Sequence, residues 1–379
     1  MDGDVYAEPL VAGGRVIVAT ENNSLYAFSA ASGRRLWRTH LGSPVAGSSL
    51  PCGNIDPSGI TSTPTIDTRR GMVYAVAFLA PARHQLAAID LSTGRVRWQR
   101  GIDPPADPTV HQQRSALSLA NGRVYVPYGG LFGDCGNYHG WVVSAPASGP
   151  SGAQANFQVP THSRGAIWAP SGASVDGRGR LFVSTGNGDS TSRFDFGNAV
   201  IRLSPSLQRQ SYFAPANAAE LNGSDTDLGS VGPLLLPGGR VFAIGKEGVA
   251  YLLDANNLGG IGHQLASLRL CTAFGGLAYA GGTVYVPCTS GVVAVRVGAR
   301  SLSVAWRGPG FRAGPPIVAG GLVWTVDLDG GQLTGLTTGA GRVSFRAALG
   351  SPPQFSTPSE SGGRVYVSGG KRVLAFSGA

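Results

Sequence analysis

Hydrophobic and polar residues alternate over short stretches along the whole chain, and turns rich in glycine separate these stretches. The segments 15–19 (Arg-Val-Ile-Val-Ala) and 181–184 (Leu-Phe-Val-Ser) are typical of them. Side chains of a strand point alternately to opposite faces, so a period of two among β-branched and aromatic residues predicts β-strands. The pattern therefore predicts an all-β protein.

One local pattern recurs eight times: a strand, a tight turn containing glycine, and a second strand. The glycines of these turns are Gly14, Gly71, Gly122, Gly179, Gly239, Gly282, Gly321 and Gly363. Successive glycines lie 39 to 60 residues apart, and the shorter spacings match a four-stranded propeller blade. We therefore predict an eight-bladed β-propeller of four-stranded antiparallel blades, with residues 1–379 forming a single domain.

The last repeat is shorter than the others. It offers three candidate strands, residues 355–358, 365–368 and 373–376, before the sequence stops at Ala379. The eighth blade is thus predicted to have three strands in this chain, unless an upstream segment that carries the fourth strand has been trimmed.

Composition agrees with a chain of short strands and tight turns, since it has 58 glycines, 25 prolines and only 13% charged residues. The formal net charge is +9, which would suit a nucleic-acid partner. However, many arginines stand singly at hairpins, as Arg15, Arg123 and Arg364 do, where they solubilise turns and protect strand edges. We therefore expect no nucleic-acid partner.

The four cysteines, Cys52, Cys135, Cys271 and Cys288, have neither the C-x-x-C spacing of zinc sites nor a following histidine for covalent haem. We expect neither zinc nor haem. An even number of widely spaced cysteines is compatible with two disulfides in an oxidising compartment, and a predicted hairpin brings Cys271 near Cys288.

An oxidising compartment would mean that the protein is exported. No apolar run approaches the roughly 20 residues of a membrane-spanning helix, so no transmembrane segment is predicted. No signal peptide precedes Val5. We expect a secreted, periplasmic or cell-surface protein whose leader is absent from this chain.

Two repeats end in the same way, with Ala27-x-x-Ala30-x-Ser32-Gly33-x-x-x-Trp37 and Ala88-x-Asp90-x-x-Thr93-Gly94-x-x-x-Trp98. Both segments resemble the tryptophan-docking motif of the pyrroloquinoline-quinone (PQQ) dehydrogenase-like propellers. The resemblance implies that each indole packs between neighbouring blades as a hydrophobic spacer.

Strand direction alternates within a blade, so loops from second to third strands emerge on the same face as loops between blades. We call this the top face. On it, the segment 165–188 is similar to the quinoprotein segment with the quinone-stacking tryptophan and a calcium-binding asparagine, which would be Trp168 and Asn187. Residues 227–254 resemble the stretch with a lysine that contacts the quinone, here Lys246. Arg114 is a further candidate for the cofactor site.

Two positions depart from the family pattern. In the third blade's loop, Cys135 lies near the position of the family's glutamate calcium ligand, and Asp134 is displaced by one residue. The family's catalytic aspartate falls on or near Arg193, with Asp189 and Asp195 as imperfect substitutes.

The disulfide between adjacent cysteines found in alcohol-oxidising members of the family is absent. Instead, Cys52 and Cys135 look placed to join two loops of the top face.

These departures favour an exported binding or scaffold module with a degenerate quinone site, monomeric, that takes a small-molecule or protein ligand on its top face. The alternative is a PQQ- and calcium-dependent dehydrogenase that oxidises an alcohol or sugar. Simpler roles also stay open: Trp168 as a packing residue, Asn187 as a turn former, and Asp134 and Arg114 as loop residues that form hydrogen bonds.

Overall fold

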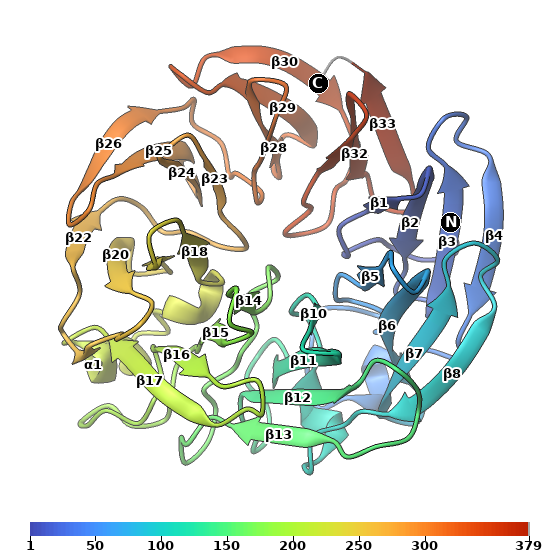
Figure 1. The fold of residues 1–379 in the computed structure, drawn as a ribbon, viewed down its shortest axis with the longest axis horizontal. Coiled ribbons are helices and arrows are strands. Elements are labelled where there is room, and N and C mark those ends of the chain that lie inside the picture. Colours follow the sequence, from blue (N-terminus) through green and yellow to red (C-terminus); the bar gives the residue numbers. More distant parts are fainter. Residues whose placement is uncertain (378–379) are drawn as a thin grey trace.

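A computed structural model describes residues 1–377 as eight small, almost wholly antiparallel sheets arranged radially around a central axis (Figure 1). The predicted eight-bladed propeller is confirmed. Within each blade the first strand lies nearest the central axis and the last lies at the rim (Figure 1).

The first four blades contain strands β1 to β17, and the short β9 pairs beside β11 in the third. They are β1 (Leu10–Ala12), β2 (Arg15–Ala19), β3 (Ser24–Ser29) and β4 (Arg35–His40); β5 (Thr65–Asp67), β6 (Met72–Leu79), β7 (Arg83–Asp90) and β8 (Val96–Gly101); β9 (His111–Gln112), β10 (Ser118–Ala120), β11 (Arg123–Gly130), β12 (Trp141–Pro146) and β13 (Ala155–Gln158); and β14 (Ser174–Val175), β15 (Leu181–Ser184), β16 (Val200–Leu203) and β17 (Arg209–Ala214).

The last four blades contain β18 to β33, except that the short β21 pairs with β17 of blade four. They are β18 (Leu234–Leu236), β19 (Arg240–Ala243), β20 (Val249–Asp254), β21 (Gly260–Ile261) and β22 (Ala266–Arg269); β23 (Ala278–Ala280), β24 (Thr283–Cys288), β25 (Gly291–Val297) and β26 (Leu302–Arg307); β27 (Ile317–Ala319), β28 (Leu322–Asp327), β29 (Gln332–Thr337) and β30 (Val343–Ala348); and β31 (Ser359–Ser361), β32 (Arg364–Ser368) and β33 (Val373–Ser377).

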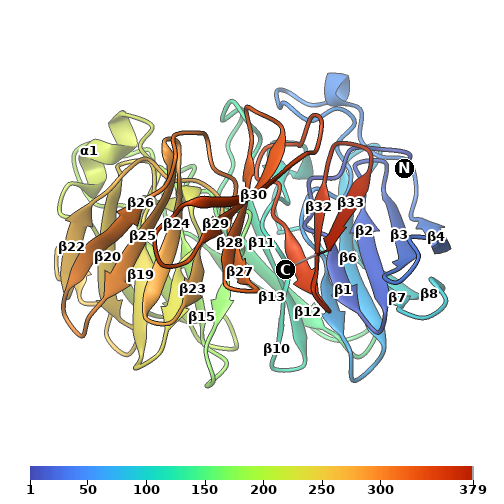
Figure 2. The ribbon, with the colours of Figure 1, turned by 90° about the horizontal axis from the view of Figure 1, so that it is seen from above.

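Helical segments are few and short: α1 (Ala218–Gly223) and the 3-10 turns η1 (Gly47–Ser49), η2 (Pro108–Val110) and η3 (Leu228–Ser230). In Figure 2, which shows the ring edge-on, α1 projects from one face of the ring. Within residues 1–377 no helix is long and apolar enough to cross a membrane.

The predicted turn glycines lie between the first and second strands of the blades. Gly14 and Gly363, for example, have φ angles of 72° and 76°, a left-handed conformation that glycine adopts without the steric cost of a Cβ atom. The hydrophobic core is divided into clusters between adjacent blades. One of them combines Ile17 and Leu25 of blade one with Val73 and Ile89 of blade two.

Trp37 packs between blades as the resemblance implied. Its Nε1 donates a hydrogen bond to the carbonyl oxygen of Leu91 in blade two, at 3.1 Å. A Cβ atom built on Gly94 would lie 2.7 Å from the indole ring, so the turn of blade two needs glycine at this position.

The eighth blade has three strands, as predicted, but its first strand was misplaced. Residues 355–358 were expected to form it, whereas β31 begins at Ser359 and Phe355 has a φ of 65°, which interrupts an extended chain. The ring closes where Ser368 donates a hydrogen bond to the carbonyl of Val5, at 2.9 Å.

Candidate functional site

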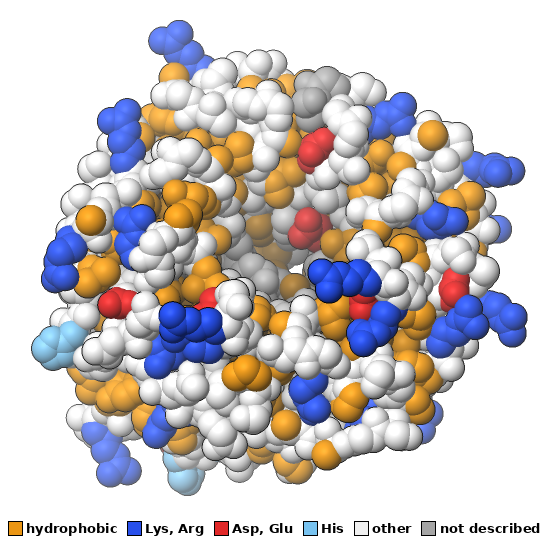
Figure 3. Space-filling view, viewed as in Figure 1, with side chains coloured by type: hydrophobic (Ala, Val, Ile, Leu, Met, Phe, Trp, Pro, Cys, Tyr) orange, Lys and Arg blue, Asp and Glu red, His pale blue; other side chains and the backbone are white. Residues whose placement is uncertain are grey.

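A cavity of about 560 Å³ lies where loops from blades three to eight meet. Both kinds of loop expected on the top face contribute to it: Asn187 and Lys246 lie between second and third strands, and Trp168 and Phe355 lie between blades. Figure 3 shows the ring hollowed at its centre. The structure thus brings Trp168, Asn187, Lys246, Arg114 and Asp134 to one cavity.

Three aromatic side chains form one wall of the cavity. The ring centroids of Trp168 and Phe355 are 6.3 Å apart, and those of Phe274 and Phe355 are also 6.3 Å apart. The backbone beside Trp168 is fixed, since the amide of Ile167 donates to the carbonyl of Tyr128 at 3.1 Å. This wall offers a rigid apolar surface to a planar molecule.

Lys246 is bound to two carboxylates. Its Nζ lies 2.5 Å from Oδ2 of Asp227 and 3.1 Å from Oδ2 of Asp225, and 5.8 Å from the centroid of the Trp168 ring. Burial by itself would lower the pKa of Lys246, but the adjacent Asp227 and Asp225 raise it above its usual value. The ammonium group is therefore charged and neutralised by the protein itself.

Asp227 is the buried member of this cluster, with 9% of its side chain exposed. Its Oδ1 accepts a hydrogen bond from the backbone amide of Asn187 at 2.7 Å. The close approach requires Gly186, because a Cβ atom there would lie 2.5 Å from the carboxylate. Burial raises the pKa of Asp227 even though Lys246 opposes the shift.

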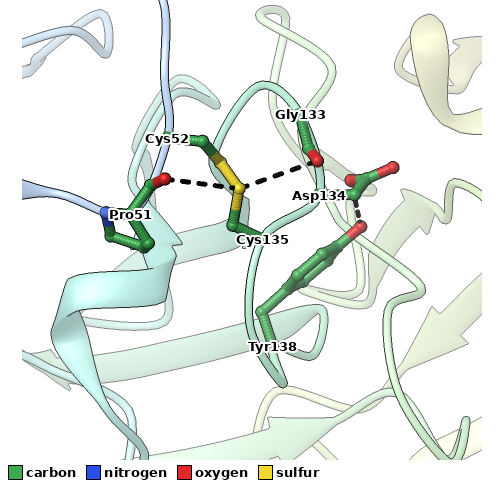
Figure 4. Close-up of a disulfide and its surroundings, with 6 residues drawn as sticks. All are labelled: Pro51, Cys52, Gly133, Asp134, Cys135 and Tyr138. Carbon is green, nitrogen blue, oxygen red and sulfur yellow. Dashed lines mark hydrogen bonds between the residues drawn. A yellow bond between two sulfur atoms is a disulfide. The ribbon is translucent and has the colours of Figure 1, made fainter.

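The two predicted calcium ligands already have partners in the protein. The side-chain amide of Asn187 donates to Asp225 at 2.8 Å, and its oxygen accepts from Asn198 at 3.1 Å. Asp134 accepts a hydrogen bond of 2.6 Å from the hydroxyl of Tyr138 (Figure 4). Among residues 1–377, no three carboxylate, imidazole or thiol groups form a cluster suited to a metal ion. As arranged, these side chains do not fit calcium, whose binding stays a prediction.

Arg114 differs from Lys246 because one of its hydrogen-bond donors has no partner among the described residues. Its guanidinium carbon lies 4.9 Å from the centroid of the Phe355 ring. Its Nη2 is buried and has no hydrogen-bond partner among the described residues. A buried donor without a partner is costly, so an acidic group of a ligand would stabilise it.

The two carboxylates predicted as substitutes for the catalytic aspartate lie outside the residues that line the cavity. Asp189 pairs with His162 at 3.0 Å. Asp195 accepts hydrogen bonds from the amides of Ser190 and Gly197, both at 3.0 Å. Both carboxylates hold loops, and their catalytic role stays a prediction.

Sequence reasoning assigned no role to Asp225 and Asp227, which lie in the cavity beside Lys246. The sequence offered a signal: the run Asp225-Thr226-Asp227 lies at the start of the segment 227–254 that resembles the quinoprotein lysine stretch.

Both disulfides are present. Cys52 pairs with Cys135, and Cys271 with Cys288. The first pair joins the loop between blades one and two to the loop of blade three that carries Asp134 (Figure 4), which confirms the predicted connection of two top-face loops.

A smaller cavity of about 200 Å³ shares Arg114 and Phe355 with the larger one and is also lined by the partly buried Glu8. Burial raises the pKa of Glu8 to about 8. The folded protein then keeps this carboxyl protonated at pH values where the unfolded chain ionises it. Stability is therefore expected to fall as the pH rises from about 5 to about 8.

Thermal unfolding measured across that pH range should show a shallower decline for Glu8→Gln than for the wild type. The exposed Glu220→Gln serves as the control and should retain the wild-type slope. An unchanged slope in Glu8→Gln would show that this carboxyl ionises normally.

The family model described as "Outer membrane protein assembly factor BamB" matches residues 1–257. The chain belongs to this family of PQQ-like propellers. No curated protein matches the chain. This PQQ-like propeller is similar in fold to a quinohemoprotein alcohol dehydrogenase, ADHIIG, from Pseudomonas putida HK5, with 16% identity, a TM-score of 0.74, and coverage of 97% of this chain and 70% of the other.

Two further solved structures have the same fold as this PQQ-like propeller. BamB from Moraxella catarrhalis shares 13% identity at a TM-score of 0.67, with coverage of 98% of this chain and 94% of that one. A europium-containing methanol dehydrogenase shares 15% identity at a TM-score of 0.70, with coverage of 97% and 82%. At these identities the likeness shows the fold alone.

Proposed function

We propose that this PQQ-like propeller is an exported binding module whose top-face cavity takes a small planar ligand with an acidic group. The observation that carries the proposal is the aromatic wall of Trp168, Phe274 and Phe355 next to the partnerless Nη2 of Arg114. The cavity volume of about 560 Å³ lies within the range of about 300 to 1,000 Å³ usual for small-molecule sites.

The balance of charge supports one anionic contact rather than several. Lys246 is paired with Asp225 and Asp227, and Arg312, another cation of the cavity, is paired with Asp329 at 2.7 Å. Arg114 is then the cation with bonding capacity left for a ligand. A quinone that carries several carboxylates would find only one free cation, Arg114, in this cavity. In this sense the quinone site is degenerate.

Location and partners belong to the same proposal. The two disulfides support an oxidising, extracytoplasmic compartment. On the face shown in Figure 3, Lys and Arg side chains are scattered from the outer edge to the central hollow rather than gathered in one stripe. This dispersion supports a protein without a nucleic-acid partner. We take the protein to act as a monomer.

A titration with PQQ, followed by quenching of tryptophan fluorescence, tests the cavity. We expect saturable binding that is equal in calcium and in EDTA, because Asn187 and Asp134 are already hydrogen bonded within the protein. Trp168→Ala should weaken binding by about tenfold, since stacking on a central aromatic residue contributes strongly to affinity.

Trp98→Phe is the matched control, because Trp98 packs on the core between blades two and three. Its affinity should equal that of the wild type. Absence of binding at micromolar quinone, or binding that Trp168→Ala leaves unchanged, would contradict the proposed site.

One observation favours oxidation of an alcohol or sugar as a second candidate function. Asp227 is a buried carboxylate with a raised pKa in the cavity wall, which suits a general base better than the loop residues Asp189 and Asp195. PQQ, when bound, would supply the hydride acceptor. Dye reduction with PQQ and a panel of alcohols and aldoses, lost in Asp227→Asn, would support this candidate, and no reduction would remove it.

A further inference from the structure

The smaller cavity, of about 200 Å³, adjoins the top-face cavity and shares Arg114, Gln354 and Phe355 with it. Its lining comes from residues that lead into the first strands of seven blades, and these strands lie nearest the central axis (Figure 1). The two cavities therefore follow one another near the axis of the ring. The smaller one is large enough for several water molecules or for one small organic molecule.

One position of the repeat stands out at this cavity, two residues before the strand nearest the axis in each blade. The residues at this position are Glu8, Thr63, Ala116, Gly172, Gly232, Gly276, Pro315 and Thr357. Seven of the eight are uncharged, so the repeat itself does not require a charged residue here. Glu8 is the exception, and it lines the cavity.

The carboxyl group of Glu8 has no partner in the described part of the chain. The backbone amide of Glu8 donates to the Thr63 hydroxyl at 2.9 Å, but the side-chain oxygens form neither a hydrogen bond nor an ion pair with residues 1–377. Burial of a carboxylate without a partner is costly, and burial alone raises the pKa of Glu8 to about 8. A cation that reached this group would stabilise its ionised form.

Glu8 is also the lining group whose charge changes near neutral pH. Burial raises the pKa of Tyr6 above its usual range, and the guanidinium of Arg114 keeps its charge. Glu21, a second buried carboxyl with a pKa raised by burial to about 7, lies outside the lining and is attracted to Arg114. The capacity of this cavity for a cation therefore depends on Glu8.

The lining is apolar where blades six and seven approach the axis, since Leu277, Pro315 and Ile317 lie there. Glu8 is the one carboxyl group among the described residues that line the cavity, whereas calcium and magnesium need several oxygen ligands. One acidic group beside an apolar wall suits a small organic cation better than a metal ion.

We propose that the smaller cavity binds a small primary amine as its ammonium cation, with the nitrogen at the carboxylate of Glu8 and the hydrocarbon chain along Leu277, Pro315 and Ile317. On binding, the carboxyl group of Glu8 releases its proton to the solvent, and the carboxylate and the ammonium form an ion pair. This site goes beyond the function proposed for the top-face cavity, and neither proposal depends on the other.

Isothermal titration of the protein with butylammonium chloride tests the proposal. We expect saturable binding in the millimolar range, because so small a ligand makes few contacts. The affinity should rise about tenfold or more between about pH 6 and about pH 8, because the proton on Glu8 competes with the ammonium. Butan-1-ol, which has the same shape without the charge, should bind about tenfold more weakly at the higher pH.

Glu8→Gln keeps the shape of the protonated carboxyl group. It should weaken the binding of butylammonium about tenfold at about pH 8 and remove the dependence on pH. Thermal unfolding of this variant at about pH 5, where the carboxyl of the wild type is protonated, should match the wild type and so show that the variant folds. Glu220→Gln makes the same chemical change on an exposed residue and should keep the wild-type affinity.

Two results would overturn the proposal. One is an affinity for butylammonium that equals that for butan-1-ol or that Glu8→Gln leaves unchanged, because the carboxylate would then not select the ligand. The other is the absence of saturable binding in the millimolar range at the higher pH, which would mean that the cavity holds only water.

Discussion

Replacing Lys246 by alanine is expected to destabilise the protein by about 3 kcal/mol, because removal of one partner leaves a buried charge uncompensated. Asp227 would lose its 2.5 Å contact to the ammonium group while its side chain stays 9% exposed. Urea unfolding of the wild type and the variant measures the difference. A loss below about 0.5 kcal/mol, the usual limit for surface substitutions, would contradict the burial of this pair.

The pH dependence of this variant has a definite sign. Without Lys246, the pKa of Asp227, which burial already raises, should rise further. A raised carboxyl pKa favours the protonated folded state, so the penalty should be smaller at about pH 5 than at about pH 8. In the double variant Lys246→Ala with Asp227→Asn, which removes the charge, we expect the pH dependence of the penalty to disappear. A penalty that is constant with pH in the single variant would argue against an ionised Asp227.

Of the changes considered, removal of the disulfide between Cys52 and Cys135 should have the largest effect on stability. The bond closes a sequence separation of 83 residues, and loss of such a constraint on the unfolded chain costs about 4 kcal/mol in the chain-entropy description. Cys52→Ala with Cys135→Ala should lower the free energy of unfolding by about that amount. A reductant would open the bond between Cys271 and Cys288 as well, so the drop in the reduced wild type should be at least as large.

The same variant should also weaken binding in the cavity. Gly133 and Asp134, which line the cavity, lie directly beside Cys135, so a loop freed from Cys52 loses its fixed position. The titration with PQQ measures this effect. Unchanged stability together with unchanged affinity would mean that the loop is held by its other contacts, such as the Tyr138 hydrogen bond to Asp134.

The fold could be predicted from the sequence because its unit is local and repeated. A hairpin glycine such as Gly14 or Gly363 and the alternating strand after it depend on neighbours only a few residues away. The prediction of a strand at residues 355–358 was wrong, because an alternating pattern cannot reveal that Phe355 adopts a left-handed φ. Helix α1 lies in a connection between blades, outside the repeat, and so had no periodic signal.

The candidate site could be predicted in part. Topology alone placed the loops of Trp168, Asn187 and Lys246 on one face, and the structure brings these residues to one cavity. The partners of Lys246 could not be derived, because Asp225 and Asp227 come from a loop about 20 residues earlier in the sequence. The free Nη2 of Arg114 likewise follows from packing between distant loops.

The most direct test of the central claim is a crystal structure of the protein soaked with PQQ. The proposed site predicts density for the quinone in the top-face cavity, with its ring against Trp168 and a carboxylate at the guanidinium of Arg114. Density bound elsewhere on the ring, or an empty cavity at saturating quinone, would contradict it.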